Sequence, residues 1–259
     1  YVQALLRVGF DTIDFGSFVS PKAIPQMIDS AEVLSQIDLE NTTSKLLAIV
    51  ANTRGAKEAA QYQDINYLGY PFSISENFQM RNTHKTIAQS IVTLQDILNI
   101  AAQKNKEVVA YLSMGFGNPY GDLWSVDIVG EWTEHLNKMG VKILSLSDTI
   151  GTSTPETIDY LFSHLIDHYQ NIEFGAHLHT SPFNWYEKVE AAYAAGCRRF
   201  DGAIQGFGGC PMAKDDLTGN MPTEKLLSFF TSKNTAHHLN PLSFESAYNE
   251  ASKIFHQYH

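Results

Sequence analysis

The sequence predicts an α/β protein built as a (β/α)8 barrel in a single domain. Short apolar segments alternate with amphipathic helical segments along the chain, which is typical of a parallel sheet covered by helices. No linker, low-complexity run or break in composition interrupts the alternation. Seven consecutive strand–helix units in one undivided domain favour a barrel over an open sheet.

The apolar segments define where the strands and helices are expected. Strands are predicted at 12–16, 46–50, 65–72, 108–112, 141–146, 171–180 and 197–204, and helices at 1–8, from about 26, 54–62, 84–103, 126–139, from 154, 185–195, 223–230 and 243–258. A barrel normally has eight strands, and the chain opens inside a helical pattern. We therefore expect the first βα unit to precede Tyr1, the barrel to span about 1–232, and a C-terminal helical extension to span about 233–259 within one domain, 1–259.

Composition excludes several classes of protein. The chain of 259 residues is 44% hydrophobic and 18% charged, with a net charge of −10, so a nucleic-acid-binding protein is not expected. No apolar run approaches the ~20 residues of a membrane span, so no membrane partner is expected. With only two cysteines, Cys197 and Cys210, a disulfide framework is not expected, and a reducing cytoplasm is the expected compartment.

The strand at 171–180 ends in two histidines, His177 and His179. Side chains alternate between the faces of a strand, so both imidazoles are expected on one face, with Leu178 on the other. Two such imidazoles are suitable ligands for a divalent metal. The alternative is a pair of polar loop residues satisfied by neighbours or water.

Other polar residues fall where predicted strands end, which is where barrel enzymes place their active sites. Asp14 lies on the first strand, Asp148 follows the fifth, and a Gly-Phe-Gly-Gly-Cys loop ending in Cys210 follows the seventh. Each has a structural alternative: Asp148 with Thr149 could stabilise a turn, and Cys210 could be a small buried side chain.

Motifs along nearly the whole chain resemble those of the 3-hydroxy-3-methylglutaryl-CoA lyase family. The glycine loop is the most specific of them. The motifs are Gly206-Phe207-Gly208-Gly209-Cys210-Pro211, Thr218-Gly219-Asn220, Thr223-Glu224, Ser17-Phe18-Val19-Ser20-Pro21-Lys22, Ser145-Leu146-Ser147-Asp148-Thr149-Ile150-Gly151, and Ser75-Glu76-Asn77-Phe78 with Asn82.

The resemblance implies a metal-dependent barrel enzyme that splits 3-hydroxy-3-methylglutaryl-CoA into acetoacetate and acetyl-CoA. The implied metal, Mg²⁺ or Mn²⁺, has His177, His179 and Asn220 as ligands, and Asp14 helps to hold the metal or its waters. The implied catalytic residues are Cys210, His177, Asp148 and Glu224. A homodimer is common in the family. Asn82 of the matching segment is a candidate for binding the acyl-CoA substrate. Arg81 is a second candidate because it, like Arg54, Lys57 and Lys85, could meet the phosphates of coenzyme A, and the alternative is that these basic residues are solvated surface.

Several positions depart from the family pattern. Asp14 stands where the family has Glu, and Thr180-Ser181-Pro182-Phe183 replaces Asp-Thr-Tyr-Gly after the second histidine. The family's Arg-Asp pair lies on the barrel strand that we expect to precede Tyr1. We therefore expect the chain as printed to be inactive or nearly so. A different 3-hydroxyacyl-CoA substrate, a related aldolase or acyl-CoA synthase, and a non-catalytic acyl-CoA-binding paralogue stay open as alternatives.

Overall fold

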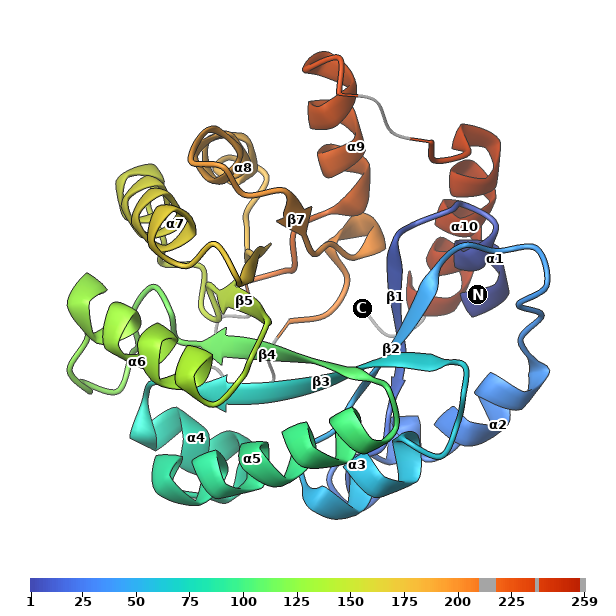
Figure 1. The fold of residues 1–259 in the computed structure, drawn as a ribbon. Helices are drawn as coiled ribbons and strands as arrows, with labels where there is room; N and C mark the ends of the chain where they lie inside the picture. Colours follow the sequence, from blue (N-terminus) through green and yellow to red (C-terminus); the bar gives the residue numbers. More distant parts are fainter. Residues whose placement is uncertain (210–217, 236–237, 257–259) are drawn as a thin grey trace.

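The computed structural model describes residues 1–209, 218–235 and 238–256. Within these residues, seven strands form one parallel sheet in chain order, from β1 to β7. The strands are β1 Thr12–Ser17, β2 Lys45–Ile49, β3 Ile65–Ser73, β4 Glu107–Ser113, β5 Ile143–Ser147, β6 Glu173–His177 and β7 Arg199–Phe200. The sheet curls into an incomplete barrel with helices outside it (Figure 1). The predicted α/β barrel class is confirmed.

The first helix precedes β1, and the other helices connect successive strands or follow the last one. The helices are α1 Val2–Leu6, α2 Ser30–Gln36, α3 Thr53–Ala59, α4 Glu76–Thr83, α5 Ile87–Gln103, α6 Val126–Lys138, α7 Pro155–His168, α8 Trp185–Ala194, α9 Thr223–Ser232 and α10 Pro241–Phe255, with 3₁₀ turns at Pro25–Met27 and Ile204–Gly206. The strands β1 and β7 end the sheet order. The expected eighth unit before Tyr1 stays a prediction.

Strand side chains alternate between two apolar layers. Leu46, Ala48 and their equivalents on other strands pack in the main core with helix residues such as Leu94 and Val129. A separate cluster of Leu47, Tyr67, Val109 and Ile143 faces the inside of the curved sheet. Because Phe174 and Ala176 of β6 belong to the outer core, the alternate residue His177 faces the barrel interior.

Several predicted boundaries differ from the structure by a few residues, and two of these differences have clear local reasons. The helix expected at 84–103 begins only at Ile87. His84 instead caps the C-terminus of a separate preceding helix, α4, in the left-handed conformation with a φ of +56°. Helix α5 then begins after a capping box formed by Thr86 and Gln89. The seventh strand is only Arg199–Phe200, because the chain turns into a 3₁₀ segment at Ile204.

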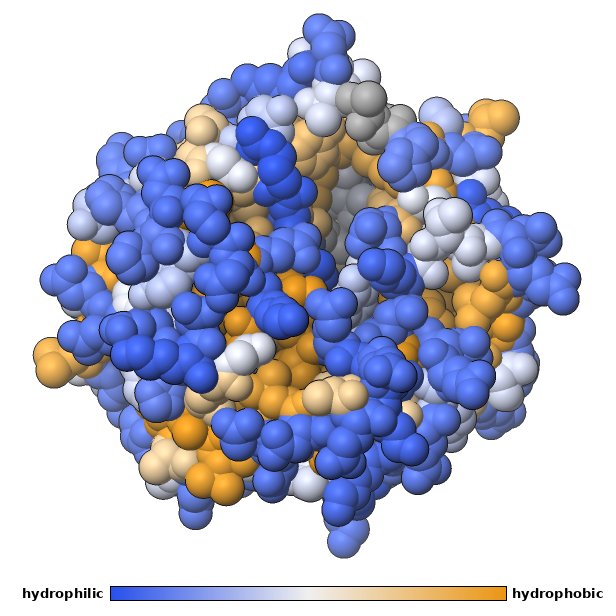
Figure 2. Space-filling view, in the orientation of Figure 1, coloured by the Kyte–Doolittle hydropathy of each residue, from blue (hydrophilic) through white to orange (hydrophobic). Residues whose placement is uncertain are grey.

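The first and last helices pack together beside β1 (Figure 1). Val8, Ile204, Ala247 and Ala251 form their shared buried cluster. The division into a barrel at 1–232 and an extension at 233–259 stays a prediction. In the orientation of Figure 1, the outer surface is mostly hydrophilic, and hydrophobic residues are visible in the hollow toward the centre (Figure 2). Among the described residues, none of the helices has the length and apolar character to cross a membrane.

Candidate metal centre

The two histidines predicted to share a face do so. His177 is the last residue of β6, and the ring centroids of His177 and His179 are 5.6 Å apart. The His177 ring also makes a T-shaped contact with the ring of Tyr111 from β4, with centroids 5.4 Å apart. The side chain of His177 is 32% exposed, so it borders an open interior, whereas His179 is buried.

His177 is oriented by Asp201, which follows β7. Its Nδ1 lies 3.1 Å from Asp201 Oδ2, and that carboxylate oxygen also accepts a hydrogen bond from Ser145 Oγ at 3.1 Å. Burial alone would raise the pKa of Asp201, but the hydrogen bond and charge of His177, with Arg199 and Ser145, lower it. An ionised carboxylate favours the tautomer of His177 that carries a proton on Nδ1, and in that tautomer Nε2 is the nitrogen that can bind a cation.

His179 is oriented by the main chain of the segment after the glycine loop. Its Nδ1 lies 2.9 Å from the carbonyl oxygen of Thr218. Because a carbonyl can only accept, Nδ1 carries the proton and Nε2 is left unprotonated in the neutral ring. Burial, with the neighbouring charge of His177, lowers the pKa of His179, so this ring is neutral near pH 7, as metal ligation requires.

Asn220 is brought opposite His179 by an antiparallel bridge. Main-chain hydrogen bonds on both sides, from Thr180 N to Gly219 O at 3.0 Å and from Met221 N to Leu178 O at 3.1 Å, fix this register. The Asn220 amide nitrogen donates to Phe207 O at 2.8 Å, which leaves its oxygen as the group that can bind a cation.

The glycines of the loop permit this close approach. Gly208 has a φ of +91°, and a Cβ added there would lie 2.9 Å from Asn220 Nδ2. Gly206 has a φ of +67°, and its Cβ would lie 2.8 Å from the Asn220 carbonyl oxygen. Only glycine combines this backbone conformation with so little space.

Asp14 lies on the interior side of β1, since Ile13 and Phe15 pack in the outer core. The side chain reaches solvent, yet surrounding protein and then the charge of Asp201 raise the pKa of Asp14 to about 7, while His177 opposes this. Asp14, His177 and Asp201 are therefore close enough in the barrel interior for their charges to affect the pKa of Asp14. Asp14 is not hydrogen-bonded to either histidine among the described side-chain contacts.

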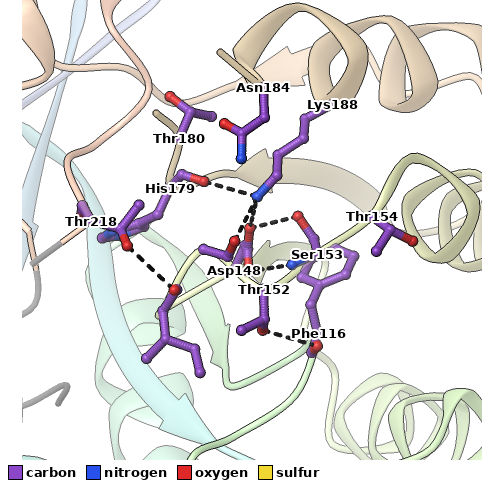
Figure 3. A network of polar contacts seen from close by, with 12 residues as sticks. Phe116, Asp148, Thr152, Ser153, Thr154, His179, Thr180, Asn184, Lys188 and Thr218 are labelled. Atoms are coloured by element: carbon purple, nitrogen blue, oxygen red, sulfur yellow. Dashed lines mark hydrogen bonds and ion pairs between the residues drawn. The ribbon is translucent and has the colours of Figure 1, made fainter. Parts of the chain in front are cut away.

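Asp148 is buried in an ion pair with Lys188 of α8, whose Nζ lies 2.7 Å from Asp148 Oδ2. Ser153 donates to both carboxylate oxygens, from its N at 3.0 Å and its Oγ at 2.5 Å. Figure 3 shows this network beside His179. With its oxygens engaged in this way, Asp148 shapes the site by holding its neighbours.

The remaining implied catalytic residues flank the glycine loop. Cys210 lies outside the described residues. Glu224, in the first turn of α9, accepts a hydrogen bond from Gln205 N at 3.0 Å. Gln205 itself has a positive φ of +59°. Glu224 therefore holds the beginning of the loop that leads to Cys210.

The candidate residues for acyl-CoA binding, Arg81 and Asn82, lie on α4. The Arg81 guanidinium is 4.8 Å from the centroid of the Tyr120 ring, and its side chain is exposed. Asn82 is half-buried. Their contact with an acyl-CoA stays a prediction.

The donor set suits a divalent cation. In the tautomers that Asp201 and Thr218 favour, His177 and His179 each have Nε2 as the ligating nitrogen, and Asn220 presents an amide oxygen. Two imidazoles with oxygen ligands are compatible with Mg²⁺ or Mn²⁺, whereas no thiolate is needed. Among the described residues, no three His, Cys, Asp or Glu side chains lie close enough together to hold a metal ion. The amide oxygen of Asn220 is therefore needed as the third ligand beside the two histidines.

Two residues that contact the candidate metal ligands, Asp201 and Lys188, were not predicted from the sequence. Asp201 follows the short strand β7, and a carboxylate at a strand end was a usable signal. Lys188 lies on the buried stripe of α8 formed with Val189 and Ala192. A lysine at an apolar position of an amphipathic helix was the signal there.

A curled parallel sheet whose strand ends gather histidine, carboxylate and amide side chains defines a (β/α)-barrel enzyme. The family model described as HMGL-like matches residues 1–249. The chain belongs to this HMGL-like family, and it is an enzyme of the acyl-CoA lyase class. The resemblance noted in the sequence is thereby confirmed.

Known proteins similar to this chain include three that bear on the site. The hydroxymethylglutaryl-CoA lyase of Bacillus subtilis is 32% identical over 88% of this chain and 75% of its own. The (R)-citramalyl-CoA lyase of Chloroflexus aurantiacus is 28% identical over 88% of this chain and 74% of its own. An HMG-CoA lyase structure from Acinetobacter baumannii, in complex with coenzyme A and 3-methylmalate, has a TM-score of 0.89 and 28% identity, covering 98% of this chain and 82% of its own.

Proposed function

We propose that this protein cleaves 3-hydroxy-3-methylglutaryl-CoA into acetoacetate and acetyl-CoA, with Mg²⁺ or Mn²⁺ held by His177, His179 and Asn220. The observation that carries the proposal is the bridge that sets Asn220 opposite His179, on the face that His177 shares. The lyases among the relatives support the reaction class. Acetoacetate and acetyl-CoA also suit leucine catabolism or ketone-body formation, and a cytoplasmic homodimer is part of the same proposal.

The reaction is a retro-Claisen cleavage. The C3 hydroxyl loses its proton, the C2–C3 bond breaks, C3 becomes the ketone of acetoacetate, and the electron pair passes to the enolate of acetyl-CoA, which is then protonated at C2. A divalent cation bound at the site would orient the hydroxyl and carboxylate of the substrate and lower the pKa of that hydroxyl.

The protein residues position this chemistry. Asp201 and Thr218 keep the two imidazoles in the tautomers that present Nε2. Glu224 and the glycines hold the loop beside Asn220. Cys210, which the resemblance implies as the acid, would donate the proton to C2 of the enolate.

A second candidate substrate is (R)-citramalyl-CoA. One relative carries this activity in its name, and the replacement of the family's Asp by Thr180 removes a carboxylate next to the site. Thr180 is buried, and its hydroxyl contacts Met221 Sδ at 3.7 Å. The replacement of Asp by Thr180 would suit a substrate whose polar groups near this position differ from those of 3-hydroxy-3-methylglutaryl-CoA.

The test uses the full-length protein as its gene encodes it. Each CoA ester is incubated with Mg²⁺ or Mn²⁺, beside an EDTA-treated sample and a His177→Ala variant, and the products are identified by mass spectrometry. We expect acetoacetate from 3-hydroxy-3-methylglutaryl-CoA, with loss of activity in EDTA and in the variant. Pyruvate from (R)-citramalyl-CoA alone would establish the second substrate. No cleavage of either ester would overturn the proposed reaction.

A further inference from the structure

The ion pair between Lys188 and Asp148 connects three separate segments at the candidate site. The Lys188 ammonium donates to Asp148 Oδ2 at 2.7 Å, to Gly151 O at 3.0 Å and to His179 O at 3.1 Å. An ammonium has three protons, so these contacts satisfy it completely. The side chains of Lys188 and Asp148 are only 2% and 1% exposed.

The other histidine is held by the sheet. Asp148 N donates to the carbonyl oxygen of His177 at 3.0 Å, a main-chain bond that continues the pairing of β5 with β6. The main chain of His177 is thus fixed by the sheet next to Asp148, and that of His179 is fixed by Lys188. Leu178, between the histidines, is buried in the outer core, so the ion pair and the core together fix the backbone from which both rings project.

The ring of His179 depends on this network by a second route. Gly151 packs closely against the side chain of Thr218: a Cβ added at Gly151 would lie only 2.7 Å from Thr218 Cγ2. Thr218 Oγ1 donates to Ile150 O at 3.4 Å, while the Thr218 carbonyl accepts from His179 Nδ1 at 2.9 Å. The loop that Lys188 holds at Gly151 therefore also supports the residue that selects the His179 tautomer (Figure 3).

We propose that Lys188 is a positioning residue for the metal centre: paired with Asp148, it sets the backbone and the ring of His179. A lysine with a merely structural role would stabilise the loop and leave the histidines unchanged. The identity of the metal rests on the proposed function, but the positioning of His179 does not.

The test compares two buried lysines. Lys188→Met removes the ammonium at the site. Lys106→Met is the matched control, because Lys106 is also buried and its ammonium donates to two main-chain carbonyls, of Tyr62 at 2.7 Å and Ile65 at 2.5 Å, beside the opposite end of β3 and β4. A double variant, Asp148→Asn with Lys188→Met, leaves no unpaired buried charge and carries the test if Lys188→Met fails to fold.

Two measurements follow at constant pH. The first records the ¹H–¹⁵N signals of the His179 ring without metal, assigned with a His179→Gln variant. The second measures Mn²⁺ affinity by electron paramagnetic resonance. We expect the Lys188→Met and double variants to shift or broaden the His179 signals and to weaken Mn²⁺ binding about 10- to 100-fold. Lys106→Met should change neither.

Unchanged His179 signals in a folded variant lacking Lys188 would overturn the inference, as would an equal change in Lys106→Met. If the unaltered protein binds no Mn²⁺, the proposed metal centre fails, and the ring signals still decide whether Lys188 positions His179.

Discussion

The Nδ1 atom of His177 lies 3.1 Å from the Asp201 carboxylate, which makes Asp201 the residue that fixes the orientation of the exposed imidazole. Replacing Asp201 by Asn keeps the shape but removes the charge and allows the amide NH₂ to face the ring, favouring the wrong tautomer. We expect Asp201→Asn to weaken Mn²⁺ binding about 10- to 100-fold, measured by electron paramagnetic resonance. The variant Asp167→Asn serves as the control because Asp167 is exposed. Equal Mn²⁺ affinities in the two variants would refute the role of Asp201.

The glycine loop offers a second prediction with an internal control. Gly208→Ala and Gly121→Ala both force a side chain into positive φ, at +91° and +78°, which costs about 1–2 kcal/mol each. Only Gly208 adds a Cβ against Asn220 Nδ2, while the position at Gly121 has no atom within 4 Å. Both variants should unfold at lower temperature by calorimetry, but only Gly208→Ala should lose Mn²⁺ affinity. A similar loss in Gly121→Ala would show that strain alone matters.

Cys197 should be chemically inert in the folded protein. Burial raises the pKa of the Cys197 thiol to about 12, so almost no thiolate is present near neutral pH. Peptide mapping after iodoacetamide treatment at about pH 8 should find Cys197 unmodified, and guanidinium should make it reactive because its unfolded pKa is ~8.5. Rapid alkylation of Cys197 in the native protein would contradict this burial.

Stability at low pH should depend on Asp122, which joins the loop after β4 to the start of α4. Its carboxylate accepts from Ser75 Oγ, from Asn77 N at 3.1 Å and from Asn77 Nδ2 at 2.5 Å. Partial burial opposes ionisation, but these hydrogen bonds lower the pKa of Asp122. The stabilisation is therefore complete above the unfolded pKa of ~3.9 and is lost as the pH falls through the lower, folded pKa.

The variant Asp122→Ala should lower the free energy of unfolding by about 1–3 kcal/mol near neutral pH, measured by urea denaturation. The difference from the unaltered protein should shrink below about pH 4. Asp159→Ala, at an exposed position of α7, should have little effect at any pH. A difference for Asp122→Ala that grows on acidification would reverse the assigned sign.

The sequence was sufficient where periodicity controls structure. The period of two along the predicted strand 171–180 placed His177 and His179 on one face, although β6 itself ends at His177. The alternation of apolar and amphipathic segments predicted the barrel. It was insufficient where long-range contacts decide. The break at His84 depends on a left-handed residue between two capped helices, and the partners of Lys188 come from segments up to forty residues away. Neither pattern has a local period.

The most direct test of the account is a Mn²⁺ titration of the unaltered protein, His179→Ala and His164→Ala, followed by electron paramagnetic resonance. His164 is an exposed histidine of α7 that contacts Tyr160, so it controls for loss of an imidazole. We expect one Mn²⁺ to bind per chain, with the affinity retained in His164→Ala and weakened at least ~100-fold in His179→Ala. Stoichiometric binding that survives in His179→Ala, or no binding by the unaltered protein, would contradict a metal centre at His177, His179 and Asn220.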